Sequence, residues 1–383
     1  MAKTWHIITG EYPPQSGGVS DYTEQLAAGL ATSGCQAHVW CPSSAGATPH
    51  HERVEAHRFG ENFSPRNLFR LGKLLNRFPA PRSLLVQYAP NAFGLRGLNI
   101  PFCCWLCWRS LFRRDDVRVM FHEPFFYFAW QRPQRNLLAL SQRLMAMLLL
   151  AASRVVYLSI PAWEKMLGRY AWLRRPPMRW LPVPATIPRF DDSQAVAAIR
   201  RQLTNDEDGK LIVGHFGTYG EHLAPLLSRI FTKLLQTNPQ AQGICLGGRG
   251  ERFVDELIGA HPELKNRISA TSFLSPGEVS LYLQACDLLV QPYPDGVSSR
   301  RTSVMAGLAH GLPIVTTTGF LSEKIWTETD CVALAVAGDA EKFVQAAEAL
   351  LSDPAARARL ADRARTAYEQ NFALERTLKE LCA

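Results

Sequence analysis

The sequence predicts an α/β protein with two doubly wound, parallel-sheet domains. Short apolar runs alternate with amphipathic helical stretches along the chain, which is the pattern of βαβ units. Glycine-rich loops join predicted strands to predicted helices in both halves. With 383 residues, the chain is also long enough for about two or three domains.

The first domain is expected over residues 1–185. Its helices are expected over 22–33, directly after the first strand, and over the strongly apolar stretch 137–152. The strands are the short apolar runs 5–9, 38–41, 83–88, 117–121 and 155–158. The segment 180–188 carries three closely spaced prolines, so we expect an extended linker there.

The second domain is expected over 186–365. Its expected strands are 210–215, 241–246, 268–271, 288–291 and 313–317, and its expected helices include 223–236, 276–286 and 302–310. The chain is helical in period from about residue 341. The last part, 366–383, is expected to pack back on the first domain as a helix.

The net charge of +8 is unevenly distributed. Residues 1–185 hold 22 Lys/Arg and 10 Asp/Glu, a net charge of +12, whereas 186–383 hold 20 and 24, a net charge of −4. The first half is therefore expected either to meet an anionic partner or simply to present a solvated basic face.

Cysteine spacing and hydropathy favour a cytoplasmic protein that is soluble or peripheral to a membrane. The nine cysteines have no metal or disulfide spacing, and Cys103, Cys104 and Cys107 are interpreted as core residues of an apolar run. The N-terminus does not resemble a signal peptide. The longest apolar run, 144–152, is far shorter than the ~20 residues that span a bilayer.

The strongest chemical signal is the stretch 292–317, PYPDGVSSRRTSVMAGLAHGLPIVTT. It places Arg300 and Arg301 in a loop just before a predicted helix of small residues. Guanidinium groups bind phosphate oxygens in pairs, and a helix N-terminus adds free N–H groups and a favourable dipole. An anion-binding loop is therefore predicted.

Glycine loops follow strands in both halves. Gly17 and Gly18 follow the first strand, and a second loop over 217–220 follows the first strand of the second domain. A third loop contains Gly247, Gly248 and Gly250. Together with the arginine loop, they predict a phosphorylated ligand held between two domains. Taken alone, a glycine pair indicates only a turn, with Ser20 or Asp21 as the helix cap.

His122 and Glu123 end a predicted buried strand, where functional side chains often project. His122 is either a donor to a sugar hydroxyl or a carbonyl, or a satisfied core histidine. The dinucleotide-binding fingerprint, the P-loop lysine motif and the GxSxG nucleophile elbow do not occur in the sequence.

In this order the motifs resemble the retaining glycosyltransferases of family 4, which have the GT-B fold. The resemblance rests on EYPPQSGGVSDYT, QYAPNAFGLRG, FHEP, and the run from SFLSPGEVSLYLQACDLLVQPY through AHGLPIVTT. It covers nearly the whole chain. It implies a nucleotide-sugar donor bound mainly by the C-terminal domain, an acceptor bound mainly by the N-terminal domain, and no metal or other cofactor.

The resemblance also implies roles for individual residues. His122, Arg300 and Arg301 are the expected catalytic residues, with His122 reaching the donor sugar. Acceptor contacts are expected from Ser20, Asp21, Tyr22 and Glu123. Donor contacts are expected from Gly17, Gly18, Gly217, Thr218, Gly248, Phe273, Leu274, Asp295, Ser299 and Thr302.

The chain departs from the family pattern at two places. Where many members have an Arg and a Lys after the first strand of the second domain, it has GTYGEH. Where many have two glutamates eight positions apart, it has Ser298 and Ala306. We expect Arg300 and Arg301 to replace the missing cations, and Asp295 to replace a lost carboxylate.

Retention without an evident enzyme nucleophile implies front-face attack by an acceptor hydroxyl, with stabilisation of the leaving diphosphate as the main task. Polysaccharide, cell-envelope and lipid-linked glycan synthesis all fit this reaction. Basic residues around 66–77 and 109–114 suit an anionic membrane and a lipid-linked acceptor, and nucleic acid is not expected. The alternatives are a non-catalytic partner protein of the same fold and a nucleotide-sugar epimerase.

Overall fold

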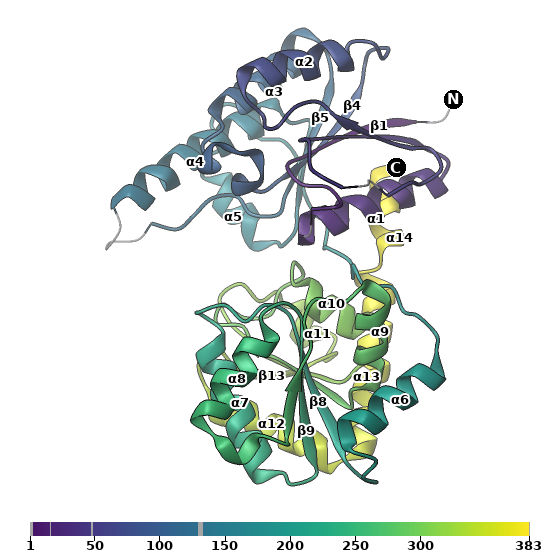
Figure 1. Ribbon diagram of the computed structural model, residues 1–383. Helices are drawn as coiled ribbons and strands as arrows, with labels where there is room; N and C mark the ends of the chain where they lie inside the picture. The colour runs from purple at the N-terminus through teal and green to yellow at the C-terminus, as the bar shows by residue number, and fades with distance from the viewer. Residues whose placement is uncertain (1–2, 16, 47–48, 129–132, 383) are drawn as a thin grey trace. The chain divides into compact units, whose positions relative to one another are not determined.

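The computed structural model describes residues 3–15, 17–46, 49–128 and 133–382. The chain forms two compact units, each built on a parallel sheet (Figure 1). Unit 1 comprises residues 1–183 and 374–383, and unit 2 comprises 184–373. The α/β class and the two Rossmann-like sheets agree with the prediction.

Unit 1 contains a seven-stranded sheet in the order β3-β2-β1-β4-β5-β6-β7, and every pair is parallel. The strands are β1 (Thr4–Thr9), β2 (Gln36–Cys41), β3 (Val54–Arg58), β4 (Ser83–Tyr88), β5 (Asp116–Phe121), β6 (Val155–Leu158) and β7 (Met178–Trp180). The helices are α1 (Gly18–Thr32), α2 (Pro65–Leu75), α3 (Ile100–Phe112), α4 (Pro133–Ala152), α5 (Ala162–Gly168) and α14 (Leu374–Cys382).

Unit 2 contains a six-stranded sheet in the order β10-β9-β8-β11-β12-β13. The strands are β8 (Leu211–Phe216), β9 (Ala241–Leu246), β10 (Ile268–Ala270), β11 (Leu288–Gln291), β12 (Ile314–Thr318) and β13 (Ala333–Val336). The helices are α6 (Ser193–Thr204), α7 (Ala224–Thr237), α8 (Gly250–Ala260), α9 (Pro276–Ala285), α10 (Thr302–Ala309), α11 (Ile325–Glu328), α12 (Ala340–Ser352) and α13 (Pro354–Asn371).

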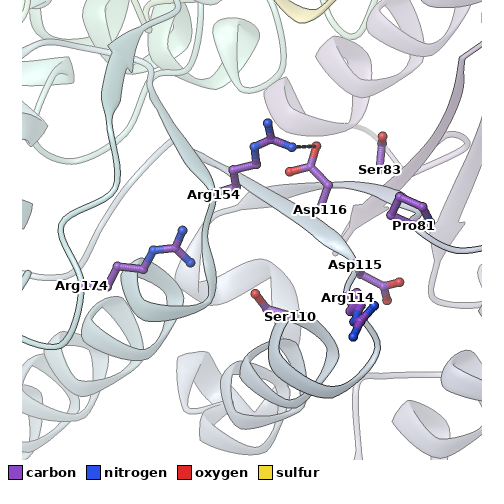
Figure 2. Close-up of a pocket in the computed structure, with 8 residues that line it drawn as sticks. All are labelled: Pro81, Ser83, Ser110, Arg114, Asp115, Asp116, Arg154 and Arg174. Carbon is purple, nitrogen blue, oxygen red and sulfur yellow. Dashed lines mark ion pairs between the residues drawn. The ribbon is translucent and has the colours of Figure 1, made fainter.

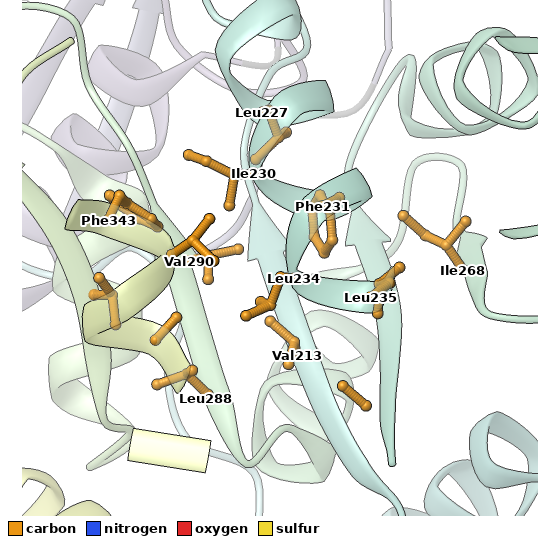
Figure 3. Packing of buried hydrophobic residues seen from close by; sticks show 14 of the residues in the cluster. Val213, Leu227, Ile230, Phe231, Leu234, Leu235, Ile268, Leu288, Val290 and Phe343 are labelled. Carbon is orange, nitrogen blue, oxygen red and sulfur yellow. The ribbon is translucent and has the colours of Figure 1, made fainter. Parts of the chain in front are cut away.

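The core of unit 2 shows why these segments take this form. Leu227, Ile230, Phe231, Leu234 and Leu235 recur at helical spacing along α7 and are all fully buried. They pack on side chains of β8 and β11 and on Phe343 of α12 (Figure 3). Strands β9 and β11 are buried along their whole length, and their sequences are accordingly mostly apolar, with Gln242 and Gln291 as the polar exceptions.

The strand orders mark one position in each sheet where a ligand is favoured. The order reverses between β1 and β4 in unit 1, and between β8 and β11 in unit 2. In open parallel sheets, ligands bind beyond the carboxyl ends of the strands at such a switch point. The relevant loops are therefore those after β1 and β4, and those after β8 and β11.

The end of the chain returns to unit 1. Helix α14 packs on α1, where a Cβ added at Gly29 would lie 2.9 Å from a Leu378 methyl carbon. Lys3 Nζ donates a hydrogen bond to the Leu381 carbonyl at 3.0 Å, and Arg179 pairs with Glu380 at 2.5 Å. The returning segment begins at residue 374. The expected boundary at 366 falls inside α13, which belongs to unit 2.

Two expectations about α3 need correction. Cys103 is buried, but Cys104 is exposed and Cys107 is only partly buried. Arg109, expected on the basic surface, is fully buried, where its Nε donates to Asp115 at 2.5 Å. In the described part of the chain, no helix combines the length and the apolar character needed to cross a bilayer.

Candidate functional site

The strongest group of candidate residues lies at the switch point of unit 2. The loop after β11 begins at Pro292 and runs to α10, and the loop after β8 begins at Gly217 and runs to α7. A hydrogen bond from Gln291 Nε2 to the Phe216 carbonyl, 3.1 Å long, joins the ends of these two strands. The two loops therefore start side by side.

Arg300 and Arg301 both pair with one carboxylate. Arg300 Nη2 lies 3.2 Å from Asp295 Oδ2, and Arg301 Nη2 donates to Asp295 Oδ1. The Arg301 guanidinium also stacks on the Tyr293 ring, 4.5 Å from its centroid. The two arginines and one aspartate carry a net charge of +1. Asp295 thus orients both guanidinium groups.

Helix α10 starts directly after this pair. Arg301 occupies its N-cap position, and no described side chain caps it. Thr302, the first helical residue, is only partly buried. The N–H groups and the positive dipole end of α10 add to the attraction for an anion at this place.

A second carboxylate, which sequence reasoning missed, approaches the same loop. Glu323 Oε1 accepts hydrogen bonds from the Ser299 backbone N–H, at 2.9 Å, and from its hydroxyl, while Oε2 accepts from Trp326 Nε1 at 2.6 Å. Burial raises the pKa of Glu323, and these hydrogen bonds oppose the rise. Ser299 is therefore engaged by the protein itself. The adjacent Ser298 hydroxyl is buried and has no partner among the described residues.

The glycine loops of unit 2 are closely packed against each other. A Cβ at Gly247 would lie 2.5 Å from the Gly217 carbonyl oxygen, and Gly247 has a φ of 117°. A Cβ at Gly248 would lie 2.3 Å from the ring of Phe273, which is 82% exposed. These glycines allow contacts that a side chain would prevent.

The other expected donor residues border these loops. Thr218 is exposed, and Leu274 is partly buried beside Phe273. Phe273 therefore offers a largely open aromatic face next to bare backbone. Such a surface suits stacking of a nucleotide base.

His215 is a further candidate that sequence reasoning missed. It is 1% exposed, and its Nδ1 lies 2.8 Å from the Val290 carbonyl oxygen. Because that oxygen only accepts, Nδ1 carries the proton and Nε2 is an acceptor. Nε2 has no partner among the described residues and lies 3.5 Å from where a Cβ of Gly217 would be. The signal in the sequence is a polar residue inside an otherwise apolar strand, LIVGHF.

In unit 1, the N-terminus of α1 is already occupied by a carboxylate. Glu11 Oε1 accepts a hydrogen bond from the Ser20 backbone N–H at 3.2 Å. A Cβ at Gly17 would lie 2.7 Å from the same oxygen, and Gly18 follows as the first residue of α1. The expected phosphate contact at Gly17 and Gly18 therefore competes with a negative charge that the chain itself supplies.

The expected acceptor residues differ in accessibility. Ser20 is fully buried, and its hydroxyl donates to the Gln15 carbonyl at 2.6 Å; Tyr22 is also fully buried. Asp21 is partly buried and Glu123 is exposed. Burial, together with the nearby charges of Glu24 and Glu11, raises the pKa of Asp21 to about 6. Asp21 and Glu123 are thus the two of these four residues whose side chains reach the surface.

His122 directly follows the last residue of β5, at the carboxyl edge of the sheet where it was expected. Its Nε2 lies 2.8 Å from Gln87 Oε1, which only accepts, so Nε2 carries the proton and Nδ1 is an acceptor. Burial lowers its pKa to about 3. His122 is therefore neutral near pH 7, and it can accept a hydrogen bond from a sugar hydroxyl rather than donate one.

A pocket of about 490 Å³ lies at the opposite edge of the unit 1 sheet (Figure 2). Ser83 and Asp116, which begin β4 and β5, line it together with Arg114, Arg154 and Arg174. Asp116 pairs with Arg154 at 3.8 Å and with Arg118 at 3.0 Å. Because this pocket lies at the amino ends of the strands, it is not the switch-point site.

Two family models match the chain. One, described as "Glycosyl transferases group 1", matches residues 210–353, and one described as "Glycosyltransferase Family 4" matches residues 16–189. A search of curated proteins found no match.

Solved glycosyltransferase structures share the fold over nearly the whole chain. Sucrose-phosphate synthase from Thermosynechococcus elongatus is 17% identical with a TM-score of 0.73, covering 99% of this chain and 97% of that one. Anabaena HepE, in complex with UDP and glucose, is 14% identical with a TM-score of 0.71, covering 99% and 98%. WaaG, a glycosyltransferase involved in lipopolysaccharide biosynthesis, is 14% identical with a TM-score of 0.64, covering 98% of each.

Proposed function

Because the chain belongs to the family 4, or group 1, glycosyltransferases and has a GT-B fold, we propose that it transfers a sugar from a UDP-sugar to an acceptor hydroxyl with retention of configuration. The observation that carries the donor assignment is the paired arginines at the switch point of unit 2, directly before α10. The choice of UDP is supported by the UDP bound to the structurally similar HepE.

In this proposal, unit 2 stabilises the leaving diphosphate. Arg300, Arg301 and the N-terminus of α10, rather than a bound metal ion, offset the charge that develops on the β-phosphate. The bond from the sugar C1 to the phosphate oxygen breaks, and a bond from C1 to the acceptor oxygen forms on the same face. The acceptor proton passes to the departing phosphate.

The remaining site residues receive positioning roles. The bare backbone at Gly217 and Gly248 admits the diphosphate and base, and Phe273 stacks on the base. His215 Nε2 accepts a hydrogen bond from a ligand hydroxyl. In unit 1, His122 Nδ1 accepts from a sugar hydroxyl and Asp21 contacts the acceptor.

The first experiment combines ligand-induced stabilisation with turnover. We expect UDP to raise the Tm of the wild type, because a ligand at ~100 times its Kd stabilises by about 2.7 kcal/mol. ADP, GDP and CMP should raise it less. Arg301→Ala should abolish the UDP effect and lower transfer by about 100- to 1000-fold. Arg252→Ala is the matched control, since Arg252 is an exposed arginine of α8 that pairs only locally with Glu256.

The outcomes separate the proposal from its alternatives. Stabilisation by UDP with neither sugar transfer to any acceptor nor hydrolysis of the donor would indicate a non-catalytic partner protein. Conversion of a UDP-sugar to its epimer without an acceptor would indicate an epimerase. The anomeric coupling constant of the product, measured by NMR, tests retention directly.

We further propose that the acceptor is lipid-linked and that unit 1 binds an anionic membrane peripherally, in cell-envelope or polysaccharide synthesis. Phe69 of α2 and Trp108, Leu111 and Phe112 of α3 are all exposed, the last two by more than 70%. Helices α2 and α3 pack together, so these side chains belong to one helical layer. Exposed basic residues accompany them: Arg66, Arg70, Lys73, Arg77, Arg113 and Arg114. Apolar side chains with adjacent cations are the pattern of an interfacial membrane surface.

A further inference from the structure

A row of polar and aromatic side chains covers one face of the unit 1 sheet, on the strands farthest from β7. His6 of β1 is the register partner of His38 on β2, which in turn faces Glu55 on β3, and Trp40 of β2 faces His57. Because register partners in a parallel pair project to the same face, these five side chains lie together. The other face of the same strands carries the apolar residues that pack on α1.

Three of these residues converge on one point. His38 Nδ1 lies 2.9 Å from His57 Nε2 and 3.5 Å from Glu55 Oε2, and His57 Nε2 lies 3.7 Å from the same Glu55 oxygen. Nitrogen and oxygen ligands at about 2.0–2.1 Å from a tetrahedral zinc ion lie about 3.3–3.4 Å apart. The three separations lie on both sides of that value, so a small movement would place all three atoms at bonding distance from one ion.

The surroundings hold the rings of both histidines in place. Stacking fixes the rings: His38 lies against His6 and Phe78, and His57 lies 4.1 Å from the Trp40 ring. His38 is only 1% exposed, and its Nε2 has no partner among the described residues, so its engaged nitrogen is the one that faces the cluster.

We propose that His38, Glu55 and His57 bind a zinc ion that links the edge strand β3 to β2. Two imidazoles and one carboxylate match the preference of zinc, and three protein ligands leave one coordination position for water. The solvent can reach that position, because the side chains of Glu55 and His57 are 57% and 28% exposed. Among the described residues, these are the three His, Cys, Asp or Glu side chains that bring their ligand atoms within 4.8 Å of one another.

This site goes beyond the proposed transferase function, since it lies on strands and not on the donor loops. Spacing along the chain does not reveal it, because His38 and His57 are 19 residues apart and are brought together only by strand pairing. Its consequence is structural. Strand β3 has a ladder partner on one side only, and a bound ion would give that edge a second link to the sheet.

The test is zinc uptake by the full chain after dialysis against a chelator. We expect the wild type to bind one more equivalent of zinc than Glu55→Gln or His57→Asn, with at least about 100-fold loss of affinity at this site in each variant. Glu55→Gln keeps the test valid if the histidine variant does not fold, because Glu55 is exposed. His51→Ala is the matched control, since His51 pairs with a single carboxylate, Glu24, at 3.1 Å.

Cobalt substitution identifies the ligands. We expect visible absorption bands of tetrahedral Co²⁺ without the near-ultraviolet bands of thiolate coordination, and a higher Tm with zinc in the wild type and His51→Ala only. Equal zinc uptake by the wild type and Glu55→Gln would overturn the proposal. Thiolate bands that disappear when the exposed Cys104 and Cys382 are alkylated would also overturn it. The cluster would then be a neutral hydrogen bond between two histidines.

Discussion

Three of the buried histidines have strongly lowered pKa values in the folded chain, and this gives stability a defined dependence on pH. Burial lowers the pKa of His6 and His122 to about 3 and that of His215 to about 4, against about 6.5 in an unfolded chain. Between these values the unfolded state binds more protons than the folded state. The stability that these groups contribute is therefore present above pH 6.5 and is lost as the pH falls.

We predict that the free energy of unfolding falls steeply between pH 6.5 and 4.5, by up to about 1.4 kcal/mol per pH unit for each histidine. Asp21 acts in the opposite direction, because its pKa is raised to about 6. Urea unfolding at several pH values measures the net slope. In His122→Asn, the slope of the unfolding free energy against pH should be smaller by the contribution of one histidine. An unchanged slope would show that His122 is not held in a neutral, buried form.

At the scale of single residues, short sequence motifs predicted where candidate side chains lie, but they did not predict which distant residues these side chains contact. The positions of Arg300 and Arg301 before a helix, and of His122 at a strand end, follow from short motifs and match the structure. The carboxylates of Glu11 and Glu323 were missed. Glu323 reaches Ser299 from 24 positions away, and only the folded loops bring them together.

Among the elements, the loop between β9 and α8 is tightly constrained by geometry. Gly247 has a φ of 117°, and a Cβ added to it would lie 2.5 Å from the Gly217 carbonyl oxygen. We predict that Gly247→Ala destabilises unit 2 by about 1–3 kcal/mol and weakens UDP binding, because the two loops must separate.

The control for this prediction lies at the other end of α8. Gly259 has no atom within 4 Å of an added Cβ among the described residues, so Gly259→Ala should stabilise by about 0.5–1 kcal/mol. Chemical denaturation of both variants, with and without UDP, measures the difference. Equal stabilities for the two variants would contradict the packing argument.

Strands that are buried on both faces could be predicted to within a residue or two. The bounds of β4, β6, β9 and β11 match the expected ranges, because short runs that are mostly apolar are distinctive. Strands β3, β7 and β13 were missed because they are short or lie at a sheet edge, where the apolar pattern fades. The basic residues Arg66, Arg70 and Lys73 of α2, and Arg77 just after it, recur at helical spacing, but the four buried positions of α2 are scattered among them, so its bounds were not predicted.

For the molecule as a whole, the uneven charge has a structural counterpart in unit 1. The basic residues of α2 and the end of α3 accompany exposed aromatic and aliphatic side chains, as argued above. Composition could not predict the position of this surface, because not every basic residue is exposed: Arg82 and Arg109 both form buried ion pairs with Asp115.

We predict that the protein sediments with vesicles containing anionic lipid and that salt weakens this binding, because the attraction is partly electrostatic. Phe112→Ser combined with Leu111→Ser should reduce vesicle binding by about 10-fold or more without loss of UDP binding. Val336→Ser, at an exposed apolar position of unit 2, is the control. Binding that is equally strong to neutral and anionic vesicles, or unchanged in the double variant, would refute this surface.

The return of α14 to unit 1 has a consequence for the order of events during protein synthesis. A ribosome makes residues 184–373, the whole of unit 2, before it makes the helix that packs on α1. The face of α1 that α14 covers therefore stays without its partner until residues 374–382 have been synthesised, so the packing of unit 1 depends on residues that are made after every residue of unit 2.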